Sequence, residues 1–372
     1  MKKRGERGRV RVLAGSRLFG FRLFLVLVVV NLILAGIGIA KARGFFIPEQ
    51  SQPLVVEGVI DLDDLTLEQK IAQMIVGLGI EYYADPLKKM QLGGVHLHAM
   101  VGEEAFKKTI NHFQEGMEIP FFITVDLEGC VNPFAAFRDF PSASTITTLG
   151  QAFEVGKAEG QFLKSMGIDV NFAPVVDLQD EIWNCRAFPG DEKNITELAN
   201  AYILGLQDEG IIAVAKHYPG KTLVIKDPHK YLAAAEITVE DLYPYQELAR
   251  KGQLKSVMIS HLITFGKVNS EGKPSVASER IVSGLREHFP GLIITDEVNM
   301  LGLKNFYDTE EEMYLEVCKA GADLILNFKQ DPNDIYWMIR AIATAVDEGK
   351  ISEERIDDSV RKILEAKGLV VS

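Results

Sequence analysis

Eight short apolar segments recur along this chain from about Leu65 onward, and they constrain its fold more than any other feature. The residues within each segment are continuously apolar rather than alternating, as is typical of strands covered on both faces of a sheet. The segments are Met74–Gly79, Gly94–Leu97, Phe121–Val125, Val170–Val176, Ile211–Ala215, Ser256–Ser260, Leu292–Thr295 and Ala322–Leu326.

Stretches with helical periodicity lie between these segments. Eight strands alternating with helices over roughly 300 residues predict a (β/α)8 TIM barrel. An open, doubly wound sheet is the alternative, but no GxGxxG motif follows the first strand to support it. We expect an amphipathic helix from Ser352 to close the domain, because it carries Ile356, Val360, Ile363 and Leu364 on one face. The other expected helices include Ala105–Phe113, Ala158–Leu163, Leu198–Leu206, Ile281–His288 and Tyr314–Cys318.

The N-terminus differs from the rest of the chain. Residues 1–22 are strongly basic, and the uncharged run from Leu23 to Ala40 is long enough to cross the hydrocarbon core of a bilayer. The positive-inside rule then places the N-terminus in the cytoplasm and the remainder outside. The basic residues are Lys2, Lys3, Arg4, Arg7, Arg9, Arg11, Arg17 and Arg22.

We therefore predict a cytoplasmic segment (1–22), a transmembrane signal anchor (23–40), a linker (41–61) and a barrel domain (62–372). The protein is expected in the cell membrane as a single-pass protein with its barrel outside the cytoplasm. Cleavage as a signal peptide is an alternative, since Ala40-Lys41-Ala42 has the small-x-small form of a cleavage site, and it would give a secreted protein. A buried core helix is the third interpretation, but its basic flank would be hard to place.

Charge and cysteine content narrow the range of partners. The net charge is −12 despite the basic N-terminus, which argues against nucleic acid as a partner. The three cysteines show neither metal-ligand spacing nor a CxxC motif. An odd number outside the cell leaves at least one thiol free or paired between molecules.

Polar residues, most of them ionisable, lie at or directly after the ends of most of the predicted strands. The carboxyl ends of the strands form the active-site face of a TIM barrel, so these side chains are expected to meet there. Such a convergence is hard to explain by packing alone, because burying charge is costly. The residues at these positions are His96, His98, Asp126, Glu128, Asp177, Lys216, His217, His261, Asp296, Glu297 and Asn327.

Two chemistries fit this constellation. A metal-dependent hydrolase of the amidohydrolase type would use a pair such as His96 and His98 with an aspartate. That pair belongs on the first strand and the aspartate on the last, whereas here they follow the second and seventh. The other chemistry is retaining glycoside hydrolysis, which requires a carboxylate nucleophile and a separate acid/base group. We expect no metal and no cofactor.

Specific motifs favour the glycosidase. The segment Lys216–Gly220 (KHYPG) followed by Asp227–His229 closely resembles the KHFPG…DxH signature of glycoside hydrolase family 3 β-N-acetylhexosaminidases, with matching spacing. Ile294–Met300 resembles their ITDDxxM nucleophile segment. Further resemblances are Val257–His261 to VMxxH, Asn171–Asp177 to FAPVxDV, and Gly93–Val95 and Asp126–Gly129 to early signatures of the family. The resemblance extends from about Ile71 to the C-terminus.

The resemblance implies a role for each matching residue. Asp296 would attack the anomeric carbon and form a covalent glycosyl-enzyme. His229 would be the general acid/base, and Asp227 would orient its ring and raise its basicity. The matching positions expected to bind the sugar are Asp126, Arg186, Lys216, His217 and His261.

Physical reasoning is compatible with these roles but leaves alternatives open. A histidine acid/base avoids the repulsion that a second anion would exert on Asp296. Lys216, Arg186 and Asp126 could instead form an internal ion-pair network. We interpret Asp177 as a carboxylate that anchors a loop.

The chain departs from the family pattern in two loops. The family's D-x-E-G-G-R-V-x-R-F is replaced by a segment one residue shorter, Asp126–Phe134, in which Pro133 stands where the second arginine would be. The Gly-His-Gly that follows KHFP in the family becomes Gly220-Lys221-Thr222. These changes put substrate affinity and rate in question. Cys130 and Cys185 lie near the predicted pocket and could form a disulfide outside the cell, whereas Cys318 is expected to be buried in a helix.

The predicted function is therefore release of terminal β-linked N-acetylglucosamine from glycans. The resemblance and the predicted outward location together point to fragments of cell-wall peptidoglycan as substrate. A non-catalytic, glycan-binding member of the family and the metal-dependent barrel are the alternatives.

Overall fold

The computed structural model describes residues 9–42, 46–223 and 231–372. Its centre is an eight-stranded parallel sheet with the neighbour order β10-β8-β6-β5-β4-β3-β2-β11. A parallel bridge between Ile294 and Leu324 joins the two end strands, so the sheet forms a nearly closed barrel and the open doubly wound sheet is wrong. The barrel strands are β2 (Ile75–Leu78), β3 (Gly94–His96), β4 (Phe122–Val125), β5 (Val170–Asn171), β6 (Ile212–Tyr218), β8 (Ser256–Ile259), β10 (Leu292–Thr295) and β11 (Ile325–Asn327).

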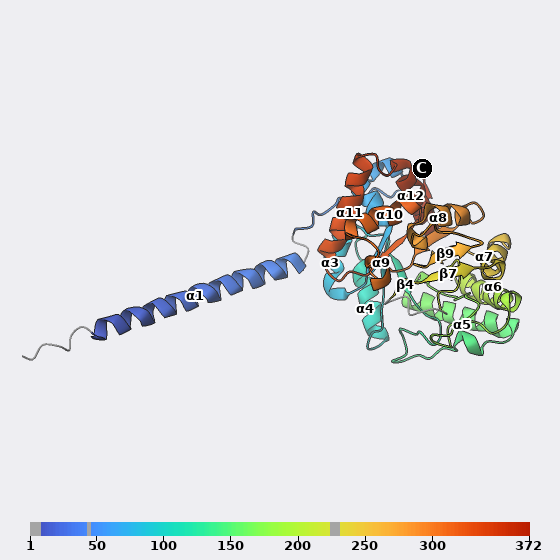
Figure 1. Cartoon of the computed structure of the whole chain (residues 1–372), viewed down its shortest axis with the longest axis horizontal. Helices are drawn as coiled ribbons and strands as arrows, with labels where there is room; N and C mark the ends of the chain where they lie inside the picture. Colours follow the sequence, from blue (N-terminus) through green and yellow to red (C-terminus); the bar gives the residue numbers. More distant parts are fainter. Residues whose placement is uncertain (1–8, 43–45, 224–230) are drawn as a thin grey trace, which may run out of the picture.

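Helices cover the outside of this barrel (Figure 1). With one exception, at Leu78, every residue of the barrel strands is buried, as the continuous apolar segments predicted. The helices are α2 (Leu67–Gln73), α3 (Ala84–Met90), α4 (Glu103–Gln114), α5 (Leu149–Met166), α6 (Glu192–Asp208), α7 (Val239–Arg250), α8 (Glu279–Arg286), α9 (Leu301–Lys304), α10 (Glu310–Ala320), α11 (Pro332–Asp347) and α12 (Glu353–Ala366).

Local sequence signals explain where several helices begin and how closely they pack. The Thr66 side chain accepts a hydrogen bond from the Gln69 backbone and the Gln69 side chain accepts one from Thr66, which starts α2 with a capping box. Helices α5 and α6 approach each other through two glycines. A Cβ atom at Gly156 would lie 2.2 Å from the Tyr202 carbonyl oxygen, and one at Gly205 would lie 2.2 Å from that of Phe153. Only glycine permits this spacing.

Two small parallel sheets lie outside the barrel and were not predicted. Strand β1 (Val59–Ile60) pairs with β12 (Val370–Val371) near the C-terminus. Strand β7 (Ala234–Ile237) pairs with β9 (Ile263–Gly266) in the connections that follow β6 and β8. Within the segment 41–61, where we expect a linker, Ile47, Pro53 and Ile60 are buried.

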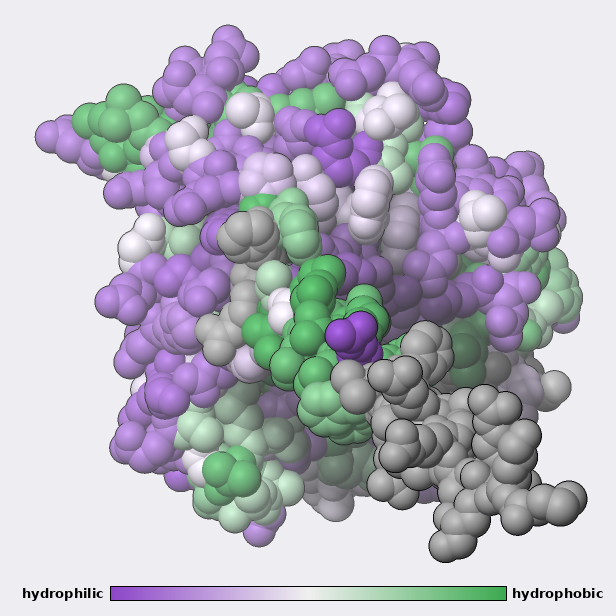
Figure 2. All heavy atoms as spheres, turned by 90° about the vertical axis from the view of Figure 1, so that its left-hand side faces the viewer, coloured by the Kyte–Doolittle hydropathy of each residue, from purple (hydrophilic) through white to green (hydrophobic). Residues whose placement is uncertain are grey.

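Helix α1 (Arg9–Ala42) projects away from the barrel (Figure 1). Its segment Phe21–Lys41 is long and apolar enough to cross a membrane, and none of its apolar window is buried in the protein. Figure 2 looks at the molecule from the side toward which α1 projects, so the exposed hydrophobic side chains of this helix stand in front of a largely hydrophilic surface. At the barrel end of the helix, Lys41 Nζ lies 3.1 Å from Asp331 Oδ2, and the Lys41 carbonyl accepts a hydrogen bond from Asn333.

Candidate active site

A cavity of about 180 Å³ opens at the carboxyl ends of the barrel strands. It brings together five of the residues that the sequence assigned to the site, from β4, β6, β10 and the segment after β5. Those five are Asp126, Arg186, Lys216, His217 and Asp296. The remaining lining residues are Glu128, Val131, Phe172, Trp183, Met258, Glu297, Leu326 and Phe328.

Four charged side chains form a compensated cluster at this cavity. Lys216 Nζ lies 2.5 Å from Asp126 Oδ1 and 2.6 Å from Glu128 Oε1. Arg186 donates two hydrogen bonds to Glu128, from Nε at 2.6 Å and from Nη2 at 2.9 Å. The Lys216 and Glu128 side chains are only 3% and 2% exposed, whereas the Asp126 side chain is 34% exposed. Asp126 is therefore the member of this pairing that is most open to a ligand.

The cluster keeps its members ionised. Burial opposes ionisation of Glu128, but Lys216 and Arg186 more than compensate, so the pKa of Glu128 is below its usual value. Burial likewise opposes the charge of Lys216, and Asp126 and Glu128 hold the pKa of Lys216 above its usual value. Two cations and two carboxylates thus neutralise one another, as a buried ionic network requires. The N–H donors and carboxylate oxygens of this cluster that are not used within it can form hydrogen bonds with sugar hydroxyls.

His96 lies behind Asp126 and between two aromatic rings. Its Nε2 is 3.5 Å from Asp126 Oδ2, and its ring stacks on Phe172 and Phe328 with centroid distances of 5.4 and 4.7 Å. Burial lowers the pKa of His96 to about 4, despite the opposing effect of Asp126. At neutral pH this ring is therefore uncharged. It packs behind the Asp126 carboxylate and limits its movement away from the cavity.

His217 is held by the carboxylate that we had interpreted as a loop anchor. Asp177 Oδ2 lies 2.9 Å from His217 Nδ1, and Asp177 Oδ1 accepts a hydrogen bond of 3.4 Å from the Thr222 backbone. Asp177 is fully buried within this network. The histidine ring is thereby oriented, with its other nitrogen left for a ligand.

Asp296 and Glu297 both line the cavity, but they are held differently. Asp296 Oδ1 accepts the backbone N–H of Glu297 at 2.8 Å. Glu297 Oε1 accepts the backbone N–H groups of Asn299 and Phe328 at 2.9 and 3.0 Å. Glu297 thus ties two loops together, whereas Asp296 lines the cavity directly after the last residue of β10.

The other expected site residues lie elsewhere. His261 does not line the cavity; its Nε2 is 2.8 Å from the Glu297 carbonyl oxygen, and its buried Nδ1 has no hydrogen-bond partner among the described residues. Asp227 and His229 lie outside the described residues. The loop that leads to them is seen as far as Leu223. Within it, Lys221 Nζ lies 3.2 Å from Asp241 Oδ2 and donates a hydrogen bond to the Glu236 carbonyl.

Cys130 and Cys185 form a disulfide with a Cα–Cα distance of 6.1 Å. Cys318 is buried in α10, as expected. Trp183, near this disulfide, stacks on the Arg186 guanidinium at 4.7 Å from the ring centroid and forms part of the cavity wall.

Glu128 is a residue of this cluster for which the sequence predicted a position after the third strand but no role. Its position two residues after Asp126 is a signal that would have found it, because both residues then face the barrel axis. Trp183 carried no such signal. In the described part of the chain, no group of three or more His, Cys, Asp and Glu side chains is arranged to hold a metal ion.

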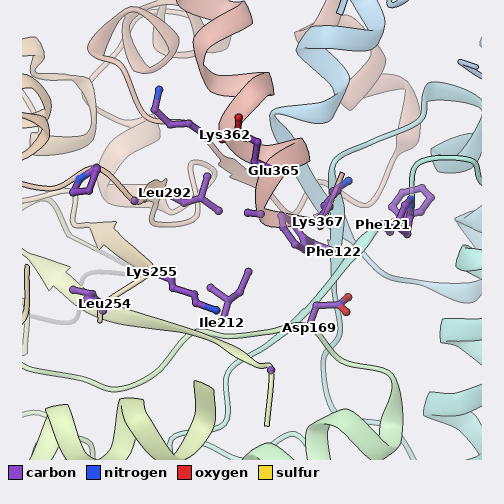
Figure 3. Close-up of a pocket in the computed structure, with 16 residues that line it drawn as sticks. Phe121, Phe122, Asp169, Ile212, Leu254, Lys255, Leu292, Lys362, Glu365 and Lys367 are labelled. Carbon is purple, nitrogen blue, oxygen red and sulfur yellow. The ribbon is translucent and has the colours of Figure 1, made fainter. Parts of the chain in front are cut away.

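A second cavity, of about 660 Å³, lies at the amino-terminal face of the barrel (Figure 3). It is lined by residues that precede or begin strands, such as Phe122, Asp169 and Ile212, and by the end of α12. Lys367 Nζ donates a hydrogen bond of 2.9 Å to Gln73 and lies 5.2 Å from the centroid of the Phe122 ring. The two cavities are thus at opposite ends of the barrel.

Comparison with known proteins places the whole barrel in one family. The family model described as the glycosyl hydrolase family 3 N terminal domain matches residues 66–366. The chain is 26% identical over 336 residues to the beta-N-acetylglucosaminidase/beta-glucosidase of Cellulomonas fimi, covering 82% of this chain but 58% of that protein. It is 26% identical over 332 residues to beta-hexosaminidase LpqI of Mycobacterium bovis (strain BCG / Pasteur 1173P2), covering 82% of this chain and 83% of that protein.

A solved structure agrees with these sequence relatives. The structure of a glycoside hydrolase family 3 beta-N-acetylglucosaminidase from Paenibacillus sp. str. FPU-7 matches with a TM-score of 0.73 and 26% identity. The match covers 82% of this chain and 62% of that one. The chain therefore spans little more than half the length of the Cellulomonas fimi protein and of this structure.

Proposed function

This chain belongs to glycosyl hydrolase family 3, and from that premise we propose that it is a retaining glycosidase that releases terminal β-linked N-acetylglucosamine. The observation that carries the proposal is the grouping of Asp296 with Asp126, Arg186, Lys216 and His217 around one cavity. One carboxylate for attack, beside a compensated set of polar groups for hydroxyl recognition, is what glycoside transfer requires. The names of the two hexosaminidase-type relatives support N-acetylglucosamine as the sugar.

The proposed reaction has two steps. Asp296 attacks the anomeric carbon while the bond to the leaving oxygen breaks, and His229, oriented by Asp227, donates a proton to that oxygen. Water then attacks the anomeric carbon and gives a proton to His229, and the ester bond to Asp296 breaks. Lys216 and Asp126 bind hydroxyl groups of the sugar throughout. A histidine suits this position because an anionic acid/base would repel Asp296.

The stereochemistry of the product tests this mechanism. Full-length protein in detergent is expected to hydrolyse an aryl N-acetyl-β-glucosaminide, and NMR should show the β-anomer of free N-acetylglucosamine first. His229→Ala should reduce turnover most for substrates with poor leaving groups, because only these need protonation. The α-anomer appearing first would refute the double displacement. Binding of the sugar without turnover would instead support the non-catalytic, glycan-binding alternative.

We further propose that α1 anchors the protein in the cell membrane, with the barrel outside the cytoplasm and glycans of the cell wall as substrate. Its apolar segment Phe21–Lys41 is unburied and follows a basic N-terminus. The disulfide between Cys130 and Cys185 adds independent support, because disulfides persist in oxidising compartments. The family and this proposed location together favour peptidoglycan fragments as the substrate.

Protease treatment of intact spheroplasts tests this arrangement. Added protease should digest the barrel, and the protein should remain with the membrane fraction with an intact N-terminus. A barrel protected from protease would contradict the orientation. A mature N-terminus directly after Ala42 would show instead that the segment is a cleaved signal peptide.

A further inference from the structure

The disulfide lies directly beside the two partners of a buried ion pair in the cavity. Cys130 is two residues after Glu128, and Cys185 immediately precedes Arg186. Glu128 and Arg186 themselves are joined by two hydrogen bonds. A covalent bond and a bidentate ion pair therefore connect the same two loops within two residues of each other.

These loops have little regular structure to hold them. Each is ordered from within. Cys130 N donates to the Glu128 carbonyl, whereas the Asp180 carboxylate accepts the backbone N–H groups of Cys185 and Arg186 at 2.9 and 2.8 Å. The Cys185 carbonyl accepts a hydrogen bond of 3.3 Å from the backbone N–H of Ser144, which lies in the turn Ala143–Thr145 before α5. Contacts to the barrel also hold each loop, because Leu127 exchanges two hydrogen bonds with the Asn171 side chain and Ala187 forms a parallel bridge with Val175. The disulfide and the ion pair connect one loop directly to the other beside the cavity.

A buried ion pair is sensitive to such positioning. The cost of removing both charges from water is recovered only with good geometry and complete hydrogen bonding. Glu128 also contacts Lys216 at 2.6 Å, and Lys216 contacts Asp126 at 2.5 Å. A displacement of the Arg186 loop would therefore pass through Glu128 to Lys216 and Asp126, the groups that face the cavity.

We infer that the Cys130–Cys185 disulfide is a positioning element for sugar binding, and that it makes substrate affinity depend on the redox state of this pair. The inference rests on the proposed function for its substrate. Cys130 is exposed whereas Glu128 and Arg186 are buried, so a reductant can reach the disulfide without entering the ionic cluster. With a dithiol, the S–S bond breaks, each cysteine gains a hydrogen, and the dithiol is oxidised to its own disulfide.

Kinetics of a double variant test the inference. Cys130→Ser/Cys185→Ser in the full-length protein should raise KM for the aryl N-acetyl-β-glucosaminide about tenfold and change kcat less than about threefold, because ground-state binding is what the ion cluster supplies. Cys318→Ser, a buried cysteine outside the cavity, is the matched control and should keep both constants. Dithiothreitol should produce the same rise in KM in the wild type and none in the double variant. A disulfide that only stabilises the fold would lower the melting temperature and leave KM unchanged, which would overturn the inference.

Hydrogen–deuterium exchange provides a readout that does not need turnover. Peptides covering 126–134 and 180–190 should exchange about tenfold faster in the double variant than in Cys318→Ser, since fewer constraints hold these loops. Unchanged exchange in both peptides would contradict the positioning role even if the protein proved inactive. Absence of hydrolysis in the wild type alone would count against the proposed function and not against the inference.

Discussion

The two ends of the barrel differ both in the volume of their cavities and in how the charged residues around each cavity are paired. The amino-terminal end holds the larger cavity, about 660 Å³ against about 180 Å³ at the carboxyl end. The smaller cavity has a compensated cluster of ionised groups beside Asp296. Charged residues also line the larger cavity, but in the part of the chain that the structure describes no salt bridge joins any two of them; they are Asp169, Lys255, Lys362, Glu365 and Lys367. Convergent, mutually paired charges are therefore the reason why we place the proposed active site at the carboxyl end.

The carboxylates at the two ends also serve different purposes. Asp169, at the amino-terminal end, accepts the Ile123 backbone N–H at 2.9 Å and so continues the pattern of the sheet. Asp296, at the other end, follows the last residue of β10 and lines the cavity. The first carboxylate completes the fold, and the second is proposed to act on the substrate.

Removing one carboxylate from each end gives the largest expected contrast. Asp296→Asn should lower kcat by on the order of 10³-fold or more, because an amide cannot form the covalent intermediate. Asp169→Asn should change kcat by less than about twofold, since an amide oxygen still accepts the Ile123 N–H. Steady-state hydrolysis of the aryl glycoside measures both. A comparable decrease of kcat in both variants would contradict the proposal that only the carboxyl end of the barrel is catalytic.

Removing the lysine from the carboxyl end is expected to have the next largest effect. Lys216→Met leaves Asp126 and Glu128 partly uncompensated, so the free energy of unfolding should fall by about 3–5 kcal/mol. Denaturant unfolding at neutral pH measures this change. Lowering the pH should recover part of the loss, because protonation removes the uncompensated charge. A variant as stable as the wild type would mean that the cluster contributes little to folding.

The lysine at the amino-terminal end should behave in the opposite way, with a smaller effect. Burial lowers the pKa of Lys367 to about 7, with Asp169 opposing this shift. Because the folded value lies below the usual 10.5, the cost of burying the charge is present in full below about pH 7 and is relieved as the pH rises toward 10.5. Lys367→Met should therefore stabilise the protein by about 1 kcal/mol near pH 6.

The pH profile of that variant is the decisive measurement. The stability difference between Lys367→Met and the wild type should shrink between about pH 7 and pH 9, as the wild-type lysine loses its proton in the folded state. Thermal unfolding of both proteins across this range tests it. A constant difference would indicate that packing, rather than charge, determines the effect at this site.

The order and kind of the barrel elements could be predicted from the sequence because they depend on local patterns. Each of the eight apolar segments overlaps a barrel strand, although β6 and β11 extend beyond the predicted ends at Ala215 and Leu326. The segment Val170–Val176 forms a regular strand only over Val170–Asn171, and Pro174, which lacks a backbone N–H, cannot continue the hydrogen-bonded ladder. Strands β7 and β9 were missed because they lie in connections and are only partly buried, so neither is a continuous apolar segment. The buried position of Ile47 likewise depends on contacts that no local pattern reveals.

The sequence by itself determined which end of the barrel would carry the ionisable groups, since each follows an apolar strand and parallel strands end at one face. Only the tertiary structure decided how these groups pair. Glu128 joins Lys216 to Arg186, His261 turns to the Glu297 carbonyl, and Cys130 meets Cys185 across 55 residues. The physical reason is that periodicity acts over a few residues, whereas these contacts form only when the barrel closes and fixes distances between loops far apart in the chain.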